Sequence, residues 1–79
     1  MTHCLKAESE YYEAYKRGDK RFEVRKNDRN FQVGDYITLL KTVNGVIDYD
    51  EKTPPKKISY ILYGGQFGID KDYCVLQLI

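Results

Sequence analysis

The fold is decided in the stretch Gly18-Asp19-Lys20-Arg21-Phe22-Glu23-Val24-Arg25, where a predicted helix gives way to a predicted strand. Successive side chains of a strand point to opposite faces of its sheet. We therefore expect Phe22 and Val24 to enter the core, and the charged side chains that alternate with them to lie on the other face. The octapeptide predicts an apolar strand that carries a charged surface close to the end of a helix.

The helix predicted before this stretch begins after Ser9, a residue type that favours the N-cap position, and runs to about Arg17. Tyr11, Ala14 and Tyr15 follow one another at the i, i+3 and i+4 spacing of a single helix face. We expect these three side chains to pack into the core, because an aromatic stripe at this spacing is typical of a buried face.

The rest of the chain is read mainly as strand. Strands are predicted over residues 2–7, 20–26, 36–43, 57–63 and 73–79. The last two carry apolar residues on both faces, which favours a curled or barrel-like sheet with the helix on its outside. Residues 44–56 contain the turn Asn44-Gly45 and the pair Pro54-Pro55, and are predicted to form a loop. The fold class expected is α+β, mainly β.

Length and charge limit the possible functions. The chain has 79 residues, enough for one domain over 1–79, and a formal net charge of only +1, so its overall charge does not favour nucleic acid. The charge is uneven, however. From Lys16 to Arg29 seven basic residues stand against three acidic ones. A cationic surface is therefore expected around the charged strand.

The two cysteines, Cys4 and Cys74, are too few and too far apart for a disulfide framework or a zinc site. We expect both to be small buried groups in a reducing compartment. The first residues lack the apolar core of a signal peptide, and no run reaches the length of a membrane span. These features predict a cytoplasmic protein that does not bind a membrane.

Asp48, Asp50 and Glu51 form a short acidic run that lacks the glycine and the further ligands of a calcium-binding loop. We expect a solvated acidic segment there. No metal site and no cofactor are predicted.

The pattern Gly-x-Lys-x-x-Glu-x-Arg in the opening octapeptide resembles the signature of the ASCH family, the activating signal cointegrator homology domains of PUA-like fold. The longer segment 20–35, together with residues 2–6 and 60–68, is similar to a small bacterial and phage subfamily of uncharacterised function. The resemblance implies a small PUA-like β-barrel with a flanking helix. It also implies that Lys20, Glu23 and Arg25 line a cleft between the helix and the barrel.

RNA or a nucleotide is the ligand that the wider PUA-like superfamily suggests. A guanidinium such as that of Arg25 can bind a phosphate or a guanine edge through two hydrogen bonds, and Glu23 would hold it in a fixed orientation. Lys20, Lys26 and Arg29 would add phosphate contacts. The residues considered for base stacking are Tyr63, Phe67 and Tyr73.

An enzymatic alternative remains open at this point. Some relatives resemble small amidohydrolases that act on an acylated nucleoside through a lysine, a hydroxyl nucleophile and a glutamate, and here Lys20 and Glu23 would be the catalytic residues. Glu23 stands where those relatives carry their threonine, so the hydroxyl would have to come from Thr38 or Ser59. Lys16, Arg17 and Arg21 were considered as cations that favour a neutral Lys20.

Two further possibilities complete the set. His3, the single histidine, is a candidate proton carrier or stacking ring, although a terminal histidine is more often a hydrogen-bonded structural residue. The chain could also be a protein-interaction module that uses exposed tyrosines and the glycine-rich segment 64–68.

Overall fold

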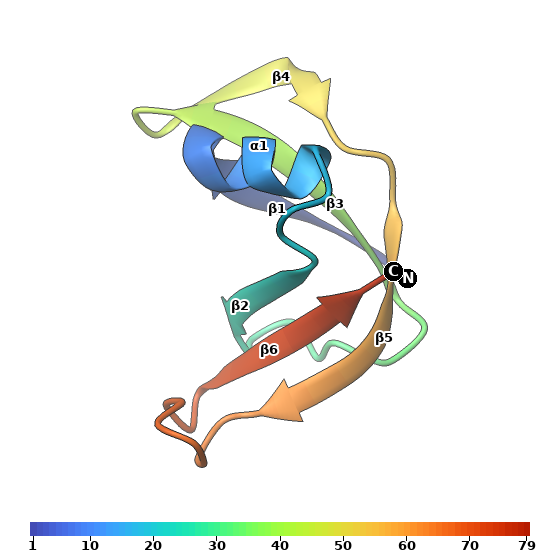
Figure 1. Cartoon of the computed structure of the whole chain (residues 1–79), viewed down its shortest axis with the longest axis vertical. Coiled ribbons are helices and arrows are strands. Elements are labelled where there is room, and N and C mark those ends of the chain that lie inside the picture. The colour runs from blue at the N-terminus through green and yellow to red at the C-terminus, as the bar shows by residue number, and fades with distance from the viewer.

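The computed structural model describes all residues from 1 to 79, as six strands and one short helix. In chain order the elements are β1 (Thr2–Glu8), α1 (Ser9–Lys16), β2 (Phe22–Lys26), β3 (Tyr36–Val43), β4 (Val46–Lys52), β5 (Lys56–Tyr63) and β6 (Tyr73–Leu78). The fold is therefore α+β and mainly β, as the sequence predicts (Figure 1).

The six strands form one curled sheet that remains open. Its strand order is β1-β3-β5-β6-β2, with β4 paired to β3 outside this path, and only the β1–β3 pair is parallel. Figure 1 shows the two halves, β1, β3 and β4 above and β2, β5 and β6 below, spreading apart from the junction of β3 with β5. The two end strands, β1 and β2, form no backbone ladder with each other. The helix α1 lies on the upper half, close to this opening.

The two halves are joined by a short contact between β3 and β5. Only Tyr36 and Ile37 of β3 pair with β5, and just before β5 the backbone N–H of Thr53 donates to Leu39 O at 3.0 Å. The hydroxyl of Thr53 accepts from Leu39 N at 3.0 Å, which satisfies the backbone where the ladder ends. Pro54 and its proline neighbour cannot donate to a ladder, so pairing with β3 is interrupted between Thr53 and the start of β5, which pairs with β3 again before it continues into the other half of the sheet.

One predicted loop is wrong. Residues 46–52 form β4, because both residues of the Asn44-Gly45 turn have positive φ, 51° and 78°, and fold the chain back as a hairpin on β3. β4 is an edge strand whose side chains are mostly exposed, so it lacks the apolar alternation by which a strand is recognised. β4 is a strand because its backbone pairs with β3, although its sequence lacks the alternation of apolar and polar residues.

The helix occupies the predicted residues but turns a different face inward. Ser9 is its first residue and Glu8 holds the N-cap position without a side-chain cap, so the predicted cap is displaced by one residue. Tyr12 and Tyr15 are fully buried, whereas Tyr11, predicted to be core, is 52% exposed. Two turns of helix can bury only one narrow stripe, and the path of the chain out of β1 selects the stripe of Tyr12 and Tyr15.

The strand predicted over residues 20–26 is present as β2, but the face predicted to turn inward is wrong, and this correction matters for function. Phe22 and Val24, expected in the core, are 46% and 51% exposed, whereas Glu23 is only 3% exposed. β2 is an end strand, and its inner face looks across the opening of the sheet instead of into a second apolar layer. That face carries Glu23 and Arg25 because paired ionic groups can occupy a partly open space that an apolar core would not fill.

The core itself is drawn from the helix, from β1, β3, β5 and β6, and from the connection between β2 and β3. Its buried apolar members are Leu5, Ala7, Tyr12, Tyr15, Phe31, Ile37, Leu39, Ile58, Ile61, Cys74, Leu76 and Leu78. Cys74 is buried as predicted, but Cys4 is exposed, because β1 turns its odd-numbered side chains inward.

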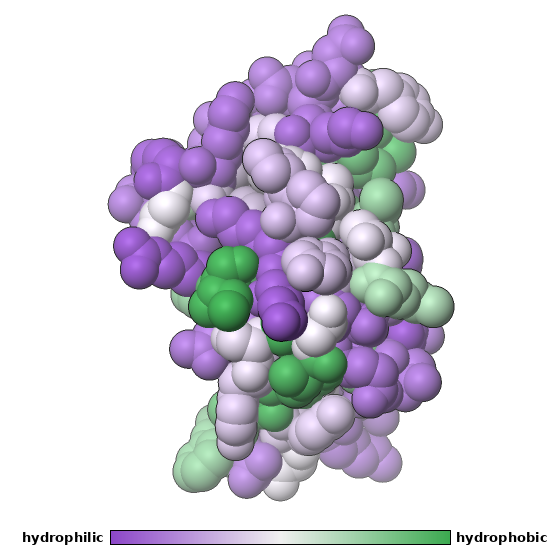
Figure 2. Space-filling view, turned by 90° about the vertical axis from the view of Figure 1, so that its right-hand side faces the viewer, coloured by the Kyte–Doolittle hydropathy of each residue, from purple (hydrophilic) through white to green (hydrophobic).

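The face that carries the two chain termini is largely hydrophilic. Figure 2 shows it with small, separate hydrophobic areas instead of one continuous apolar surface. No helix is long and apolar enough to cross a membrane. No group of three or more histidine, cysteine, aspartate or glutamate side chains is placed to hold a metal ion.

Candidate functional site

A cleft of about 490 Å³ opens where the end strands β1 and β2 face each other beside the start of α1. Its size falls within the range of small-molecule sites in proteins. Its walls combine apolar and charged side chains from all three elements and from the segment between α1 and β2. The lining residues are Lys6, Ala7, Glu8, Tyr11, Lys20, Phe22, Glu23, Val24 and Arg25.

Glu23 is the centre of an ionic cluster in this cleft. Its carboxylate accepts a hydrogen bond from Lys20 Nζ at one oxygen, and the other oxygen accepts from Arg25 Nε at 2.9 Å. The Glu23 side chain is 4% exposed, against 18% for Lys20 and 24% for Arg25. The buried carboxylate therefore fixes two cations whose outer atoms reach the solvent. The sequence resemblance predicted this convergence of the three residues.

The Arg25 side chain also connects the two ends of the sheet. Its Nη2 donates to the backbone carbonyl of Lys6 at 2.8 Å, which joins β2 to β1 where no backbone ladder does so. The guanidinium has five N–H groups, and the two on Nη1 have no partner. Lys20 Nζ donates to Phe22 O at 2.9 Å and to Glu23, which leaves one of its three N–H groups free.

Two aromatic side chains border the same cleft. Tyr11, from the first turn of α1, is 52% exposed and Phe22, at the start of β2, is 46% exposed. Lys20 Nζ lies 5.2 Å from the centre of the Phe22 ring, so the cation and the ring share one part of the wall. Sequence reasoning missed both, because each stands at a position that is apolar in pattern and only the tertiary structure shows it to be outward.

A smaller hollow of about 150 Å³ adjoins the cleft and shares Arg25 with it. Its lining residues are Leu5, Arg25, Lys26, Asp28, Arg29 and Phe31. The five residues predicted for binding, Lys20, Glu23, Arg25, Lys26 and Arg29, therefore line two adjacent depressions of one surface. The side chains of Lys26 and Arg29 are exposed and form no hydrogen bond or ion pair within the protein.

The aromatic residues that the sequence suggested for stacking lie elsewhere. Tyr63 ends β5, Tyr73 begins β6, and Phe67 lies in the connection between them, 82% exposed. None of the three lines the cleft or the hollow. They lie apart from Arg25, because β5 and β6 run away from the opening toward the far tip of their hairpin (Figure 1).

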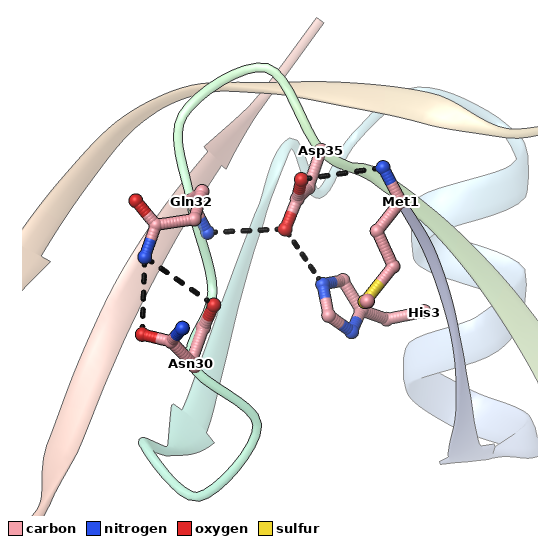
Figure 3. A network of polar contacts seen from close by, with 5 residues as sticks. All are labelled: Met1, His3, Asn30, Gln32 and Asp35. Carbon is pink, nitrogen blue, oxygen red and sulfur yellow. Dashed lines mark hydrogen bonds and ion pairs between the residues drawn. The ribbon is translucent and has the colours of Figure 1, made fainter.

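His3 has a structural role in a separate network (Figure 3). It is 5% exposed, its Nε2 lies 2.8 Å from Asp35 Oδ2, and its ring packs edge-on against Phe31 at 4.8 Å. Asp35 also accepts from Gln32 N at 3.1 Å and from the Met1 amine at 3.4 Å. The hydrogen bond to His3 is the main cause that lowers the pKa of Asp35. This network ties β1 to the start of β3 outside the cleft.

The hydroxyl of Tyr15 is buried without any hydrogen-bond partner. Burial, and then the charge of the Glu23 carboxylate, raise the pKa of Tyr15 to about 12. The phenol is therefore a neutral group beneath the ionic cluster, and its hydroxyl adds no bond to it.

A family model described as "Domain of unknown function (DUF3850)" matches residues 2–78. The chain belongs to this family. No curated protein matches it. The DUF3850 description names no ligand and no activity, so the function has to be argued from the site.

In this DUF3850 chain the cleft contains no serine, threonine or cysteine. Thr38 is buried in β3, and the Ser59 hydroxyl donates to Gln77 O at 3.3 Å, so neither supplies the nucleophile that the hydrolytic alternative requires. The cations that precede and follow Lys20 bond elsewhere. Their partners are Glu51 for Lys16, Asp19 for Arg17 and the carbonyl of Gly18 for Arg21.

Proposed function

We propose that this chain is a PUA-like domain of the ASCH type that binds RNA or a nucleotide in the cleft between β1, α1 and β2. The observation that carries the proposal is the free donor set. Two N–H groups of Arg25 and one of Lys20 are unpaired at a cleft of nucleotide size, and the buried Glu23 holds both cations in place. Donors fixed before binding lose little conformational freedom when a ligand arrives.

The cleft offers the two kinds of contact that a base requires. Tyr11 and Phe22 present half-exposed aromatic rings on which a base can stack, an interaction of about 1 to 3 kcal/mol per base. The free N–H groups of Arg25 suit the acceptor atoms on a base edge or a phosphate. The cleft is not purely cationic, since Glu8 and Glu23 also line it. This mixture favours a polar ring system over a simple anion.

The architecture supports the finer fold assignment. A PUA-like domain is a small curled sheet, and here a curled sheet runs from β1 to β2 with α1 beside the opening between these end strands. The Arg25 side chain completes the connection between the two end strands. A ligand that enters the opening would therefore contact the helix and both ends of the sheet together.

The proposal is tested by titrating the four ribonucleosides, their monophosphates and short single-stranded RNAs, followed by NMR or fluorescence anisotropy. We expect binding that shifts the signals of Lys20 and Arg25, and a loss of about 10-fold in affinity for Tyr11→Ala or Phe22→Ala, from one lost stacking contact. Tyr63→Ala and Tyr36→Ala are matched controls, because these two rings are similarly exposed, at 51% and 42%, but lie outside the cleft. Equal losses in both pairs, or no shift with any ligand, would refute the proposal.

The same samples separate binding from catalysis. Incubation with an N-acetylated cytidine should leave the acyl group in place, because no side-chain hydroxyl other than that of Tyr11 lines the cleft. Turnover that disappears in Lys20→Met would instead identify an amidohydrolase.

A further inference from the structure

We propose that the small hollow beside the cleft is a phosphate subsite, so that the preferred ligand is a phosphorylated nucleoside or an RNA backbone instead of a free nucleoside. This inference rests on the proposed function, because the nucleoside part of the ligand would occupy the larger cleft. Three features of the hollow support this assignment: its size, its charge and its position relative to Arg25.

The size of the hollow suits a phosphate better than a whole nucleoside. Its volume of about 150 Å³ is roughly that of five water molecules in the liquid. A phosphate group with its hydration fits this space, whereas drug-sized and nucleoside-sized ligands occupy sites of about 300 Å³ or more. The two depressions therefore differ in the part of a nucleotide that each can hold.

The charge of the hollow is also suited to an anion. Arg25, Lys26 and Arg29 line it against the single carboxylate of Asp28. Lys26 and Arg29 have no ionic partner in the protein, so their N–H groups are free to bind. Most other cations near them are already bonded: Lys20 and Arg25 to Glu23, and Lys16 to Glu51. Lys26 and Arg29 therefore bring two unpaired positive charges to the hollow.

Arg25 connects the hollow with the cleft. Its side chain lines both, and its guanidinium is fixed from one side by Glu23 at 2.9 Å and from the other by the carbonyl of Lys6 at 2.8 Å. A nucleotide whose base lies against Tyr11 and Phe22 would then pass over Arg25 to reach Lys26 and Arg29. The free Nη1 group can bond to the sugar or to the phosphate along this path.

The test compares each ribonucleoside with its 3′- and 5′-monophosphate by calorimetry at low salt. We expect the monophosphate of the preferred nucleoside to bind at least about 10-fold more tightly, the value of one charge-assisted hydrogen bond. In the double variant Lys26→Ala, Arg29→Ala the ratio of the nucleoside Kd to the monophosphate Kd should fall to about 2. The variant Lys57→Ala, Lys71→Ala removes two exposed lysines outside both depressions and should keep the ratio.

A third variant changes the hollow in the opposite direction. Asp28→Asn removes the carboxylate of the hollow and should raise the ratio several-fold, since a like charge no longer opposes the phosphate. A trinucleotide RNA that binds at least 10-fold more tightly than the monophosphate would identify the RNA backbone as the source of the phosphate. Equal affinity for the two would identify a free nucleotide.

The two proposals fail in different ways. Equal binding of nucleoside and monophosphate, or equal losses in the two double variants, would overturn the phosphate subsite and leave nucleoside binding intact. If no nucleoside or nucleotide binds, inorganic phosphate remains as a probe. If inorganic phosphate shifts the NMR signals of Lys26 and Arg29 in the wild-type protein, the phosphate subsite is supported although the nucleoside site is not. If inorganic phosphate shifts no signal, the phosphate subsite is overturned together with the proposed function.

Discussion

The substitution Glu23→Gln tests the physical basis of the site, because it removes one negative charge and keeps the shape of the side chain. The Glu23 carboxylate is 4% exposed and accepts hydrogen bonds from Lys20 and Arg25. Glutamine keeps one acceptor oxygen, but its NH₂ group faces a cation in place of the second oxygen. The variant should therefore separate the two cations and release the fixed orientation of Arg25.

The size of the effect follows from burial. Removing one partner of a buried ion pair costs about 3 to 5 kcal/mol. Lys20 and Arg25 keep 18% and 24% of their side chains exposed, so water can solvate them in part and the lower end applies. We expect a loss of about 3 kcal/mol from a total stability of about 4 to 12 kcal/mol for a domain of this length.

Thermal and urea unfolding measure this loss, with Glu13→Gln as the matched control. Glu13 also accepts from a lysine, Lys41, at 3.0 Å, but it is 44% exposed, so its substitution should cost much less stability than that of Glu23. We expect Glu23→Gln to lower Tm by more than about 10 °C. If the two variants lose the same stability, the carboxylate of Glu23 does not organise the cleft, and the reasoning about fixed donors is refuted.

Three further predictions concern the rest of the fold. In urea unfolding, Tyr15→Phe should leave stability unchanged or raise it by up to about 1 kcal/mol, because it removes a buried hydroxyl that has no partner. Tyr12→Phe should instead cost about 1 kcal/mol, because the Tyr12 hydroxyl donates to a carboxylate at 3.1 Å. A greater loss of stability in Tyr15→Phe than in Tyr12→Phe would contradict this. The hydrogen bond to His3 is the main cause that lowers the pKa of Asp35 in the folded protein. The ionised Asp35 therefore stabilises the fold at pH values above its pKa in the unfolded chain, and this stabilisation is lost as pH falls through its pKa in the folded protein. Stability measured from pH 6 to pH 2 should fall less steeply in Asp35→Asn, and parallel curves would exclude the link. Gly64→Ala should cost about 3 kcal/mol or prevent folding, because its Cβ would overlap two backbone carbonyl oxygens, and a loss below 1 kcal/mol would show that this tight connection can relax.

Most strands could be predicted from local pattern. The segment 36–43 is found at its predicted bounds as β3, and the predicted strands at 57–63 and 73–79 differ from β5 and β6 by one residue at one end. These strands are rich in β-branched and aromatic residues bounded by turns, so their signal is local. β4 was missed because an exposed edge strand depends on backbone pairing with its neighbour and needs no apolar alternation.

The candidate site was predicted in its charged part and missed in its apolar part. Lys20, Glu23 and Arg25 do converge, as the resemblance implied, within one cleft. Tyr11 and Phe22 were assigned to the core, because an apolar residue at a regular spacing is usually buried. Regular apolar spacing is a weaker sign of burial in an end strand or a two-turn helix, because only one side of such an element packs against the rest of the protein.

The sequence by itself determined the class of the fold, most of its strands, the position of the helix and the identity of the ionic residues, because these depend on spacing along the chain. Only the tertiary structure decided which face of β2 and of α1 turns inward. For a strand such as β2, a shift of one residue in the pairing register moves every side chain to the opposite face of the sheet. It also decided that the sheet stays open between β1 and β2, with Arg25 across the gap. Both features depend on how β1 and β2 meet, and the contact between them joins residues 19 positions apart, which no local pattern encodes.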